Sequence, residues 1–133
     1  VVFVDECVDI FNPKVIRSTA GSLFHLPVLT MGTEAFFAWC DERNLAIYAA
    51  DVYGTDSRPP EPLTDVLAEP STLAGAKTMI FGNEARGLTR EVLDRTDRIV
   101  SIPIYGKAES LNLGTSAAVM LLSLAMSSHV ERM

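Results

Sequence analysis

The feature that most constrains this chain is the alternation of short apolar runs with segments of helical pattern. Four runs have the length of buried strands and lack polar alternation, which is typical of a parallel sheet covered on both faces. These runs are residues 1–4, 45–50, 77–81 and 99–104. The intervening patterns predict helices at residues 13–20, 34–42, 64–68, 90–95 and 113–129. We therefore expect an α/β fold in which helices flank a parallel sheet.

Size and composition fit a single domain. The chain has 133 residues, of which 48% are apolar and 21% charged, and at about 150 residues per domain this predicts one domain, residues 1–133. Its longest apolar stretch, residues 117–126, is shorter than the roughly 20 residues of a bilayer span. Cys7 and Cys40 form neither a disulfide framework nor a CxxC metal motif. We expect a reduced, cytoplasmic protein without a membrane segment or a bound metal.

The start of the chain suggests that it was cut from a longer protein. The first residue is Val1 rather than an initiator methionine, and residues 1–4 are already a candidate buried strand. A signal peptide would place a basic segment before its apolar run, and none is present before this one. We expect further sequence upstream.

Charge is divided unevenly along the chain. The net charge is −6, which is unfavourable for a partner as anionic as nucleic acid. Residues 1–75 carry 4 basic and 11 acidic side chains, whereas residues 76–133 carry 7 basic and 6 acidic ones. An anionic substrate should therefore meet the C-terminal half, although an uneven solvated surface explains the same distribution.

Local signals set the starts of two helices and the place of one loop. Asn12 before Pro13 is a typical N-cap followed by proline at the first helical position. Thr89 is expected to cap the helix at residues 90–95, with Glu91 in the first turn where the helix dipole favours an acid. The prolines within residues 56–62 predict a surface loop.

The last predicted helix is apolar on almost every side. Residues 117–126 contain only one polar residue, Ser123. A helix of this kind is buried on more than one face, which is hard to achieve in so small a domain without a second subunit. We expect a homodimer that packs through this helix; a central core helix of a monomer is the alternative.

Two polar, glycine-bearing segments follow predicted strands, at residues 81–88 and 102–112. The motifs GxGxxG, GxxxxGK[ST], HExxH and GxSxG are absent from the sequence. In open α/β sheets, ligands bind beyond the carboxyl ends of the strands, where both segments fall. Gly82, Gly87 and Gly106 permit close backbone approach and positive φ. Main-chain groups of such loops could bind an adenine.

Three stretches of the chain resemble the motifs of one known enzyme family. Residues 12–28 read NPKVIRSTAGSLFHLPV, which is similar to the family's NPKVVRASAGSLFHLPV stretch. Residues 80–88 read IFGNEARGL and resemble the second motif, GNEGxGL. Residues 102–113 begin with IPI and end with SLNL, which resembles the third motif, IPM followed by SLNVSVA. In these stretches the chain resembles the SpoU (TrmH-like) RNA 2′-O-ribose methyltransferases of the SPOUT superfamily. The resemblance spans nearly the whole chain, in order.

The resemblance implies an α/β fold with a C-terminal deep trefoil knot, an exception to the rule that connections do not thread loops. It also implies a homodimer that uses S-adenosylmethionine to methylate the ribose 2′-hydroxyl of an RNA, either rRNA or tRNA. The whole chain would be the SpoU-type catalytic domain, with its site near the knot.

The resemblance further implies roles for individual residues. Three would hold the adenosyl group through backbone contacts: Gly82, Ile102 and Leu111. Three others would orient the methyl donor, the backbone of the site or the target ribose: Glu84, Ser110 and Asn112. Arg17 would contact RNA phosphate or brace the site. No metal ligand is implied.

The sequence departs from the family pattern in ways that bear on activity. Ala85 replaces the usual glycine after Glu84, which would strain the backbone if φ is positive there. Ile104 for methionine and Thr115 are tolerable variations. The family's first motif, NxGxxxR, should lie upstream of Val1, and it carries an arginine generally treated as catalytic. We expect this chain by itself to be weakly active or inactive.

Two other functions fit parts of the sequence. A non-catalytic knotted dimer that binds S-adenosylmethionine or RNA is consistent with the missing first motif and the acidic N-terminal half. A flavodoxin-like nucleotide-binding or signalling domain explains the alternation of strands and helices but not the Ser110-Leu111-Asn112 segment.

In methyl transfer, alignment of the reactants can contribute roughly 7–11 kcal/mol of the barrier. The ribose hydroxyl must also lose a proton, and the sequence does not identify the general base that accepts it. Glu84 is a candidate, but a role in capping the backbone that follows it explains this residue equally well.

Overall fold

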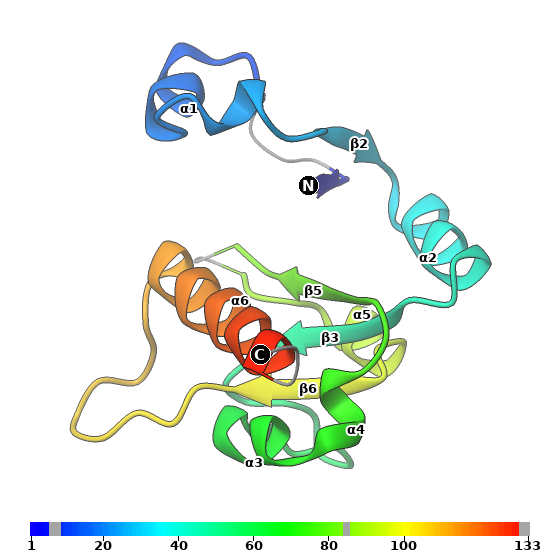
Figure 1. Ribbon diagram of the computed structural model, residues 1–133, viewed down its shortest axis with the longest axis vertical. Coiled ribbons are helices and arrows are strands. Elements are labelled where there is room, and N and C mark those ends of the chain that lie inside the picture. The colour runs from blue at the N-terminus through cyan, green and yellow to red at the C-terminus, as the bar shows by residue number, and fades with distance from the viewer. Residues whose placement is uncertain (6–8, 84–85, 131–133) are drawn as a thin grey trace. The chain divides into compact units, whose positions relative to one another are not determined.

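The computed structural model describes residues 1–5, 9–83 and 86–130. The chain forms two compact units, Val1–Arg43 and Asn44–Met133, which are described separately. In both units the strands pair in parallel, and most connections between successive strands contain a helix (Figure 1). The expected mixed α/β fold, with parallel sheets flanked by helices, is therefore confirmed.

The first unit is built around a pair of parallel strands. Val2 pairs with Leu29 and Val4 pairs with Met31. The elements of this unit are β1 (Val2–Val4), α1 (Pro13–Ser18), the 3₁₀ helix η1 (Ser22–Phe24), β2 (Leu29–Met31) and α2 (Thr33–Glu42). Strand β2 was not expected from the sequence, because three residues are too few to show a periodic pattern.

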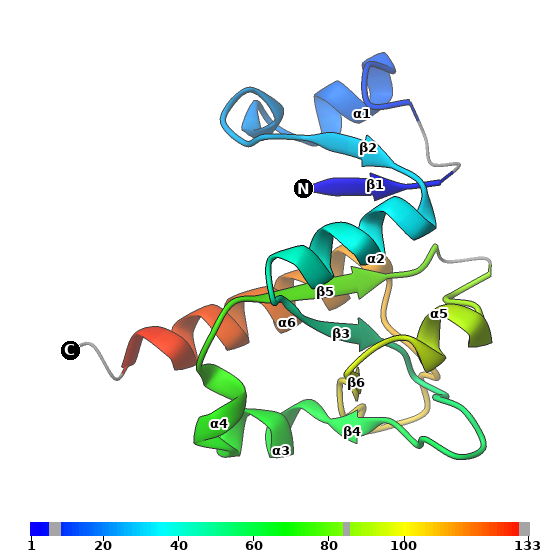
Figure 2. The same cartoon turned by 90° about the vertical axis from the view of Figure 1, so that its right-hand side faces the viewer.

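The second unit contains a four-stranded parallel sheet in the order β4-β6-β3-β5. Tyr48 in the central strand β3 lies opposite Met79 on one side and Arg98 on the other. Figure 2 shows β3 and β5 running in a common direction. The elements of this unit are β3 (Ala46–Ala50), β4 (Glu61–Pro62), α3 (Leu63–Ala68), α4 (Pro70–Leu73), β5 (Lys77–Phe81), α5 (Arg90–Asp94), β6 (Arg98–Ser101) and α6 (Leu113–Val130).

Helices cover both faces of this sheet. Successive side chains along a strand point to opposite faces of the sheet. On one face Tyr48 packs in a hydrophobic core with residues of α3 and α6, and on the other face Ala49 packs in a second core with Leu93 of α5. Helix α6 also contacts α4 and β5. The first core consists of Tyr48, Leu63, Val66, Val100, Met120 and Leu124. Coverage of both faces explains why β3 reads as a continuous apolar run.

The two expected helix starts are confirmed. The side-chain oxygen of Asn12 accepts a hydrogen bond from the Lys14 N–H at 2.9 Å, and Pro13 occupies the first helical position of α1. The hydroxyl oxygen of Thr89 accepts from the Val92 N–H at 3.2 Å at the start of α5. Both caps satisfy an N–H that has no partner within its own helix.

The bounds of two strands differ from the sequence-based expectation. The apolar run at residues 99–104 becomes strand β6 only from Arg98 to Ser101, and its last part belongs to the loop that follows. Pro103 has no N–H to donate to a sheet ladder, which favours the end of the strand there. Within the expected loop at 56–62, Glu61 and Pro62 form the edge strand β4 against β6, where proline is tolerated.

Asp5 links β1 to the start of α2. Its N–H donates to the Met31 carbonyl at 3.0 Å, and its carboxylate accepts from both the N–H, at 2.9 Å, and the hydroxyl of Thr33. Gly32 precedes the helix and supplies no side-chain cap. Asp5 therefore provides from another strand the acceptor that a local N-cap residue would otherwise supply.

Helix α6 has 18 residues and is the longest helix of the described part. None of the helices in that part, α6 included, combines the length and apolarity that crossing a membrane requires.

Candidate functional site

A cavity of about 680 Å³ lies within the second unit, at the carboxyl ends of β3, β5 and β6. The arrowheads of these three strands point to the same side in Figure 1, and the loop between β6 and α6 extends from that side. Each strand contributes its last residue and parts of the loop after it to the wall: residues 50–56 at β3, residues 81–83 and 86–88 at β5, and residues 101, 102, 104, 110 and 111 at β6. Helices α5 and α6 also contribute to the lining, through Arg90, Leu93, Leu113, Ser116 and Met120. Its volume lies within the range of small-molecule sites, about 300–1,000 Å³.

The loop after β5 folds back on itself over Gly82. The Gly87 N–H donates to the Asn83 carbonyl at 2.9 Å, and the Arg86 N–H donates to the Asn83 side-chain oxygen at 2.6 Å. A Cβ on Gly82 would lie 2.6 Å from the Leu88 nitrogen and 2.7 Å from the Gly87 oxygen. Gly82 is therefore required for this close backbone approach, whereas Gly87 supplies a positive φ of 64°.

The loop after β3 forms a wall that the motif comparison missed. The Asp51 carboxylate accepts from the N–H groups of Tyr53 at 3.1 Å and of Gly54 at 2.7 Å. Gly54 has a φ of 64°, and a Cβ there would lie 2.9 Å from the Pro60 side chain. The rule that ligands bind beyond the carboxyl ends of strands applies to residues 45–50 as well. That signal could have identified this loop.

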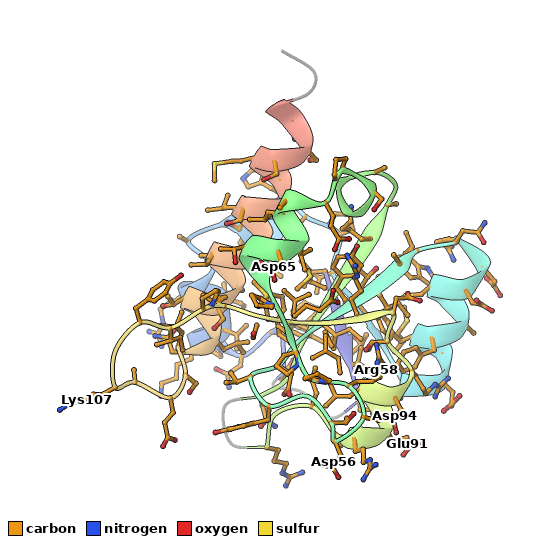
Figure 3. All side chains as sticks on the ribbon, turned by 90° about the horizontal axis from the view of Figure 1, so that it is seen from below. Asp56, Arg58, Asp65, Glu91, Asp94 and Lys107 are labelled. Carbon is orange, nitrogen blue, oxygen red and sulfur yellow. The ribbon has the colours of Figure 1, made fainter. Side chains whose placement is uncertain are left out.

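Arg58 fixes the same loop to α5. Its guanidinium donates to the Leu93 carbonyl at 2.8 Å and to the Asp97 carbonyl at 3.1 Å. Figure 3 shows Arg58 beside α5, on which Glu91 and Asp94 are labelled. The positive charge of Arg58 thus lies at the C-terminal end of α5, where a helix dipole favours it.

The loop after β6 supplies the third wall. Ile102, Ile104, Ser110 and Leu111 line the cavity, while residues 105–109 between them are exposed. Asn112 begins α6: its side-chain oxygen accepts from the Thr115 N–H at 2.8 Å, and its carbonyl accepts from the Ser116 N–H at 2.9 Å. By fixing the start of α6, Asn112 fixes where Ser110 and Leu111 stand.

The structure brings together four of the seven site residues predicted from the sequence. Gly82, Ile102, Ser110 and Leu111 line one cavity. Asn112 adjoins it as the N-cap of α6 and is not a lining residue. Arg17 is exposed in the last turn of α1, in the other unit. Glu84 and the substituted Ala85 lie outside the described residues.

Charges at the cavity have both signs. Arg86 and Arg90 contribute to the lining and are exposed, as is Asp56. The Asp51 carboxylate accepts hydrogen bonds from two backbone N–H groups, which stabilise its negative charge. The cavity therefore presents two cationic groups in a chain whose net charge is −6.

Arg98 forms the principal ion pairs of the sheet, away from the cavity lining. Its guanidinium lies 3.0 Å from the Glu69 carboxylate and 3.3 Å from that of Glu61. The hydrogen bond to Glu69 raises the pKa of Arg98, and the charge of Glu61 adds to this against an opposing effect of burial. Arg98 joins β6 to the edge strand β4 and to the junction of α3 and α4.

Within residues 1–5, 9–83 and 86–130, no group of three or more histidine, cysteine, aspartate or glutamate side chains is placed to hold a metal ion. The cavity is lined by backbone loops, apolar side chains, two arginines (Arg86 and Arg90) and two aspartates (Asp51 and Asp56).

A parallel sheet with a cavity at the carboxyl ends of its strands defines an α/β ligand-binding protein. Comparison with protein families narrows this class, because the model of the SpoU rRNA Methylase family matches residues 1–122. The chain belongs to that family.

Three similar proteins illustrate the relationship. The chain is 35% identical over 124 residues to the 23S rRNA (guanosine(2553)-2′-O)-methyltransferase RlmP of Bacillus subtilis (strain 168), covering 93% of this chain and 46% of that protein. It is 31% identical over 121 residues to the 23S rRNA (uridine(2479)-2′-O)-methyltransferase of Streptomyces viridochromogenes, covering 90% and 40%. The crystal structure of an AdoMet-bound rRNA methyltransferase from Sinorhizobium meliloti superposes with a TM-score of 0.79 at 26% identity, covering 94% of this chain and 44% of that one.

The chain thus spans less than half of the length of these relatives. The cavity and its three loops all lie within the shared part.

Proposed function

We propose that this chain is the catalytic part of an S-adenosylmethionine-dependent methyltransferase that acts on the ribose 2′-hydroxyl of rRNA or tRNA. The observation that carries the proposal is the cavity at the carboxyl ends of β3, β5 and β6, lined by Gly82, Ile102 and Leu111. The two curated relatives named above are 2′-O-methyltransferases of 23S rRNA, and the solved relative has AdoMet bound.

The residues present fit the adenosyl part of this donor. The folded-back loop over Gly82 brings main-chain groups to the wall without an intervening side chain, as recognition of an adenine edge by backbone requires. Phe81, Leu88 and Ile102 offer apolar surface to the faces of a ring. S-adenosylmethionine, when bound, supplies a methyl group on a positively charged sulfur.

The work of the protein is then to align the target hydroxyl and to accept its proton. Ser110 lies in the cavity wall, and its hydroxyl would orient the ribose or the donor. Asn112 would act through the backbone that it fixes, because its side-chain oxygen is bound to the Thr115 N–H. Glu84 and Arg17 remain proposed participants, Glu84 at the donor loop and Arg17 at an RNA phosphate.

The proposal includes an assembly and a location. Two copies of the chain would pack through α6, because Leu121, Leu122 and Met126 on this helix are 49%, 60% and 63% exposed in the single chain. The C-terminal segment would form the trefoil knot that the family resemblance implies. Residues 1–133 would be one catalytic domain that works in the cytoplasm, without a metal.

The test follows the methyl group. The longest form of the protein that contains this chain is incubated with total RNA and with S-adenosylmethionine labelled in the methyl group, and the RNA is digested to nucleosides. We expect label in a 2′-O-methylated nucleoside. Label on a base would contradict ribose methylation, and donor binding without transfer to any RNA would favour a non-catalytic binding module.

A matched pair of variants links the activity to the cavity. Ser110→Ala should lower methyl transfer while S-adenosylhomocysteine still binds, because only the hydroxyl is lost from the wall. Ser71→Ala removes the same group from an exposed position on α4, outside the cavity lining, and should leave transfer unchanged. Equal transfer by both variants would remove Ser110 from the proposed site.

A further inference from the structure

Arg58 joins two walls of the cavity without lining it. It belongs to the loop after β3, of which residues 50–56 form one wall. Its guanidinium donates at 2.8 Å to the carbonyl of Leu93, a residue of α5 that lines the cavity. Arg58 itself is half-buried and is not a lining residue. Any influence of Arg58 on a bound ligand therefore passes through the two walls that it joins.

The loop after β3 is held by hydrogen bonds rather than by burial. None of residues 51–57 is buried, and Figure 3 shows Asp56 and Arg58 of this loop next to α5. The Thr55 N–H donates to the Arg58 carbonyl at 3.0 Å, and the Arg58 N–H donates to the Thr55 carbonyl and hydroxyl oxygens, each at 3.1 Å. A Cβ on Gly54 would clash with the Arg58 carbonyl oxygen. Because Gly54 and Thr55 line the cavity, a shift of Arg58 moves this wall.

The two acceptors of the Arg58 side chain belong to the core and to the sheet. Leu93 is 3% exposed and packs in the hydrophobic core between α5 and the sheet. The second acceptor is the Asp97 carbonyl, at 3.1 Å. The Asp97 N–H donates to the Ile47 carbonyl at 2.8 Å, and the Asp97 carboxylate accepts from the Ile47 N–H at 2.7 Å, which fixes Asp97 to β3. The guanidinium of Arg58 therefore ties an exposed loop to the best-packed part of the second unit.

We propose that Arg58 is a positioning residue for the methyl donor: by joining the loop after β3 to α5, it sets the separation of two walls of the donor cavity. This inference rests on the proposed function, because it takes the ligand of the cavity to be the donor. Binding beside a loop is more favourable when the loop is already held in place, since ordering it on binding would cost free energy. Loss of the tether should therefore weaken donor binding although no contact with the donor is removed.

The chemistry of the tether favours arginine over lysine. The guanidinium is planar and presents several N–H donors in fixed directions. Nη1 and Nη2 of Arg58 use two of these directions for two carbonyls, one in α5 and one just before β6. A lysine keeps the positive charge, but its single nitrogen on a flexible stem would hold the same carbonyls less firmly. Lysine should therefore replace Arg58 only in part.

The experiment measures donor-site affinity and stability in the same samples. The longest form of the protein that contains this chain is prepared as the parent and as the variants Arg58→Ala, Arg58→Lys and Thr96→Val. Calorimetry gives the affinity for S-adenosylhomocysteine, and denaturant unfolding gives the stability. We expect Arg58→Ala to lower the affinity by roughly tenfold, the effect of losing one hydrogen bond from a charged group, and Arg58→Lys to lower it by less.

Thr96→Val is the matched control for stability. The Thr96 hydroxyl donates at 2.8 Å to the same Leu93 carbonyl as Arg58 does, but Thr96 follows α5 and is neither in the loop after β3 nor a lining residue. Removal of this buried hydroxyl should lower the free energy of unfolding and leave the affinity for S-adenosylhomocysteine unchanged. A merely structural role of Arg58 predicts instead that each variant loses affinity in proportion to its loss of stability.

The outcomes separate the inference from the proposed function. Parent-like affinity in Arg58→Ala, or an equal loss of affinity in Thr96→Val, would overturn the inference and leave the donor site standing. If Arg58→Ala does not fold, Arg58→Lys decides: a partial loss of affinity without a matching loss of stability supports the inference, and parent-like affinity overturns it. No binding of S-adenosylhomocysteine by the parent would contradict the proposed function, and the inference with it.

Discussion

Gly82 illustrates how a single missing side chain shapes the site. The backbone of Gly87 and Leu88 occupies the space that a Cβ on Gly82 would need, with the Leu88 nitrogen at 2.6 Å. These atoms belong to main chain that is held by the Asn83–Gly87 hydrogen bond and cannot turn aside as a flexible side chain could. A methyl group at residue 82 must therefore move a wall of the cavity.

The first prediction compares two glycine-to-alanine changes. Gly82→Ala should weaken binding of S-adenosylhomocysteine by at least about tenfold, or about 1.4 kcal/mol, because the loop after β5 is displaced. Gly114→Ala adds the same methyl group within α6, where the nearest atom is 3.7 Å away, and should leave binding unchanged while favouring the helix. Calorimetry on both variants measures the difference; equal affinities would show that the loop is not part of the donor site.

Single residues could be predicted from the sequence where their role depends on neighbouring residues in the chain. Gly82 and Gly87 could be singled out as glycines of a turn after a strand, and the caps Asn12 and Thr89 as helix starts. Asp5 could not be recognised, because its partner Thr33 is 28 residues away in sequence and only the pairing of β1 with β2 brings them together. The roles of Glu84, Ser110 and Arg17 stay predictions.

At the scale of elements, the N-terminus of α6 positions one wall of the cavity. Asn112 satisfies the Thr115 N–H, and the two residues before it, Ser110 and Leu111, are lining residues. The start of the helix and the shape of the site therefore depend on the same side chain.

The second prediction separates capping from chemistry at Asn112. Asn112→Ala should lower the free energy of unfolding by about 1 kcal/mol, because the Thr115 N–H loses its acceptor. Asn112→Asp keeps an acceptor oxygen and should keep most of that stability. Denaturant unfolding measures the stability of both variants. Methyl transfer by the longest form of the protein measures whether the amide of Asn112 takes part in the reaction. Transfer that is lost in the aspartate variant despite unchanged stability would show that the amide itself contacts substrate or donor, contrary to a purely positioning role.

Element bounds were predictable where burial is continuous and less so at edges. Strands β3 and β5 match the apolar runs closely, because helices cover both faces of the sheet. The apolar run at residues 99–104 was predicted to be one strand, but it contains both strand β6 and the cavity-wall residues Ile102 and Ile104. The sheet interior and the cavity wall both favour apolar residues, so the sequence does not show where one ends and the other begins. Strands β2 and β4 are too short for a periodic signal, and pairing with a distant strand determines them.

At the scale of the whole molecule, α6 carries apolar residues beyond those of its own core. Met120 and Leu124 are 2% and 8% exposed against the sheet, whereas Leu121, Leu122 and Met126 on the same helix remain exposed. The sequence pattern showed that more than one face of this helix is apolar. It could not show which face packs on the sheet, since that depends on the crossing of α6 over α3, α4 and β5.

The third prediction tests the proposed homodimer. Light scattering on the parent chain should give twice the monomer mass of 14.5 kDa. Leu121→Glu should give the monomer or aggregates, because a charge buried without a partner in the interface is costly. Thr64→Glu adds the same charge at an exposed position on α3 and should leave the dimer intact. A parent chain that scatters as a monomer at micromolar concentration would contradict the proposed assembly.

The central claim is that the cavity at the carboxyl ends of β3, β5 and β6 holds the methyl donor. Its most direct test is titration of the isotope-labelled chain with S-adenosylhomocysteine, followed by amide chemical shifts. The account predicts that the largest saturable shifts occur at Gly82, Ile102 and Leu111, with smaller ones through the loop after β3, whose Tyr53 and Gly54 line the same cavity. Saturable shifts confined to residues outside this cavity, or no shifts at millimolar ligand, would contradict it.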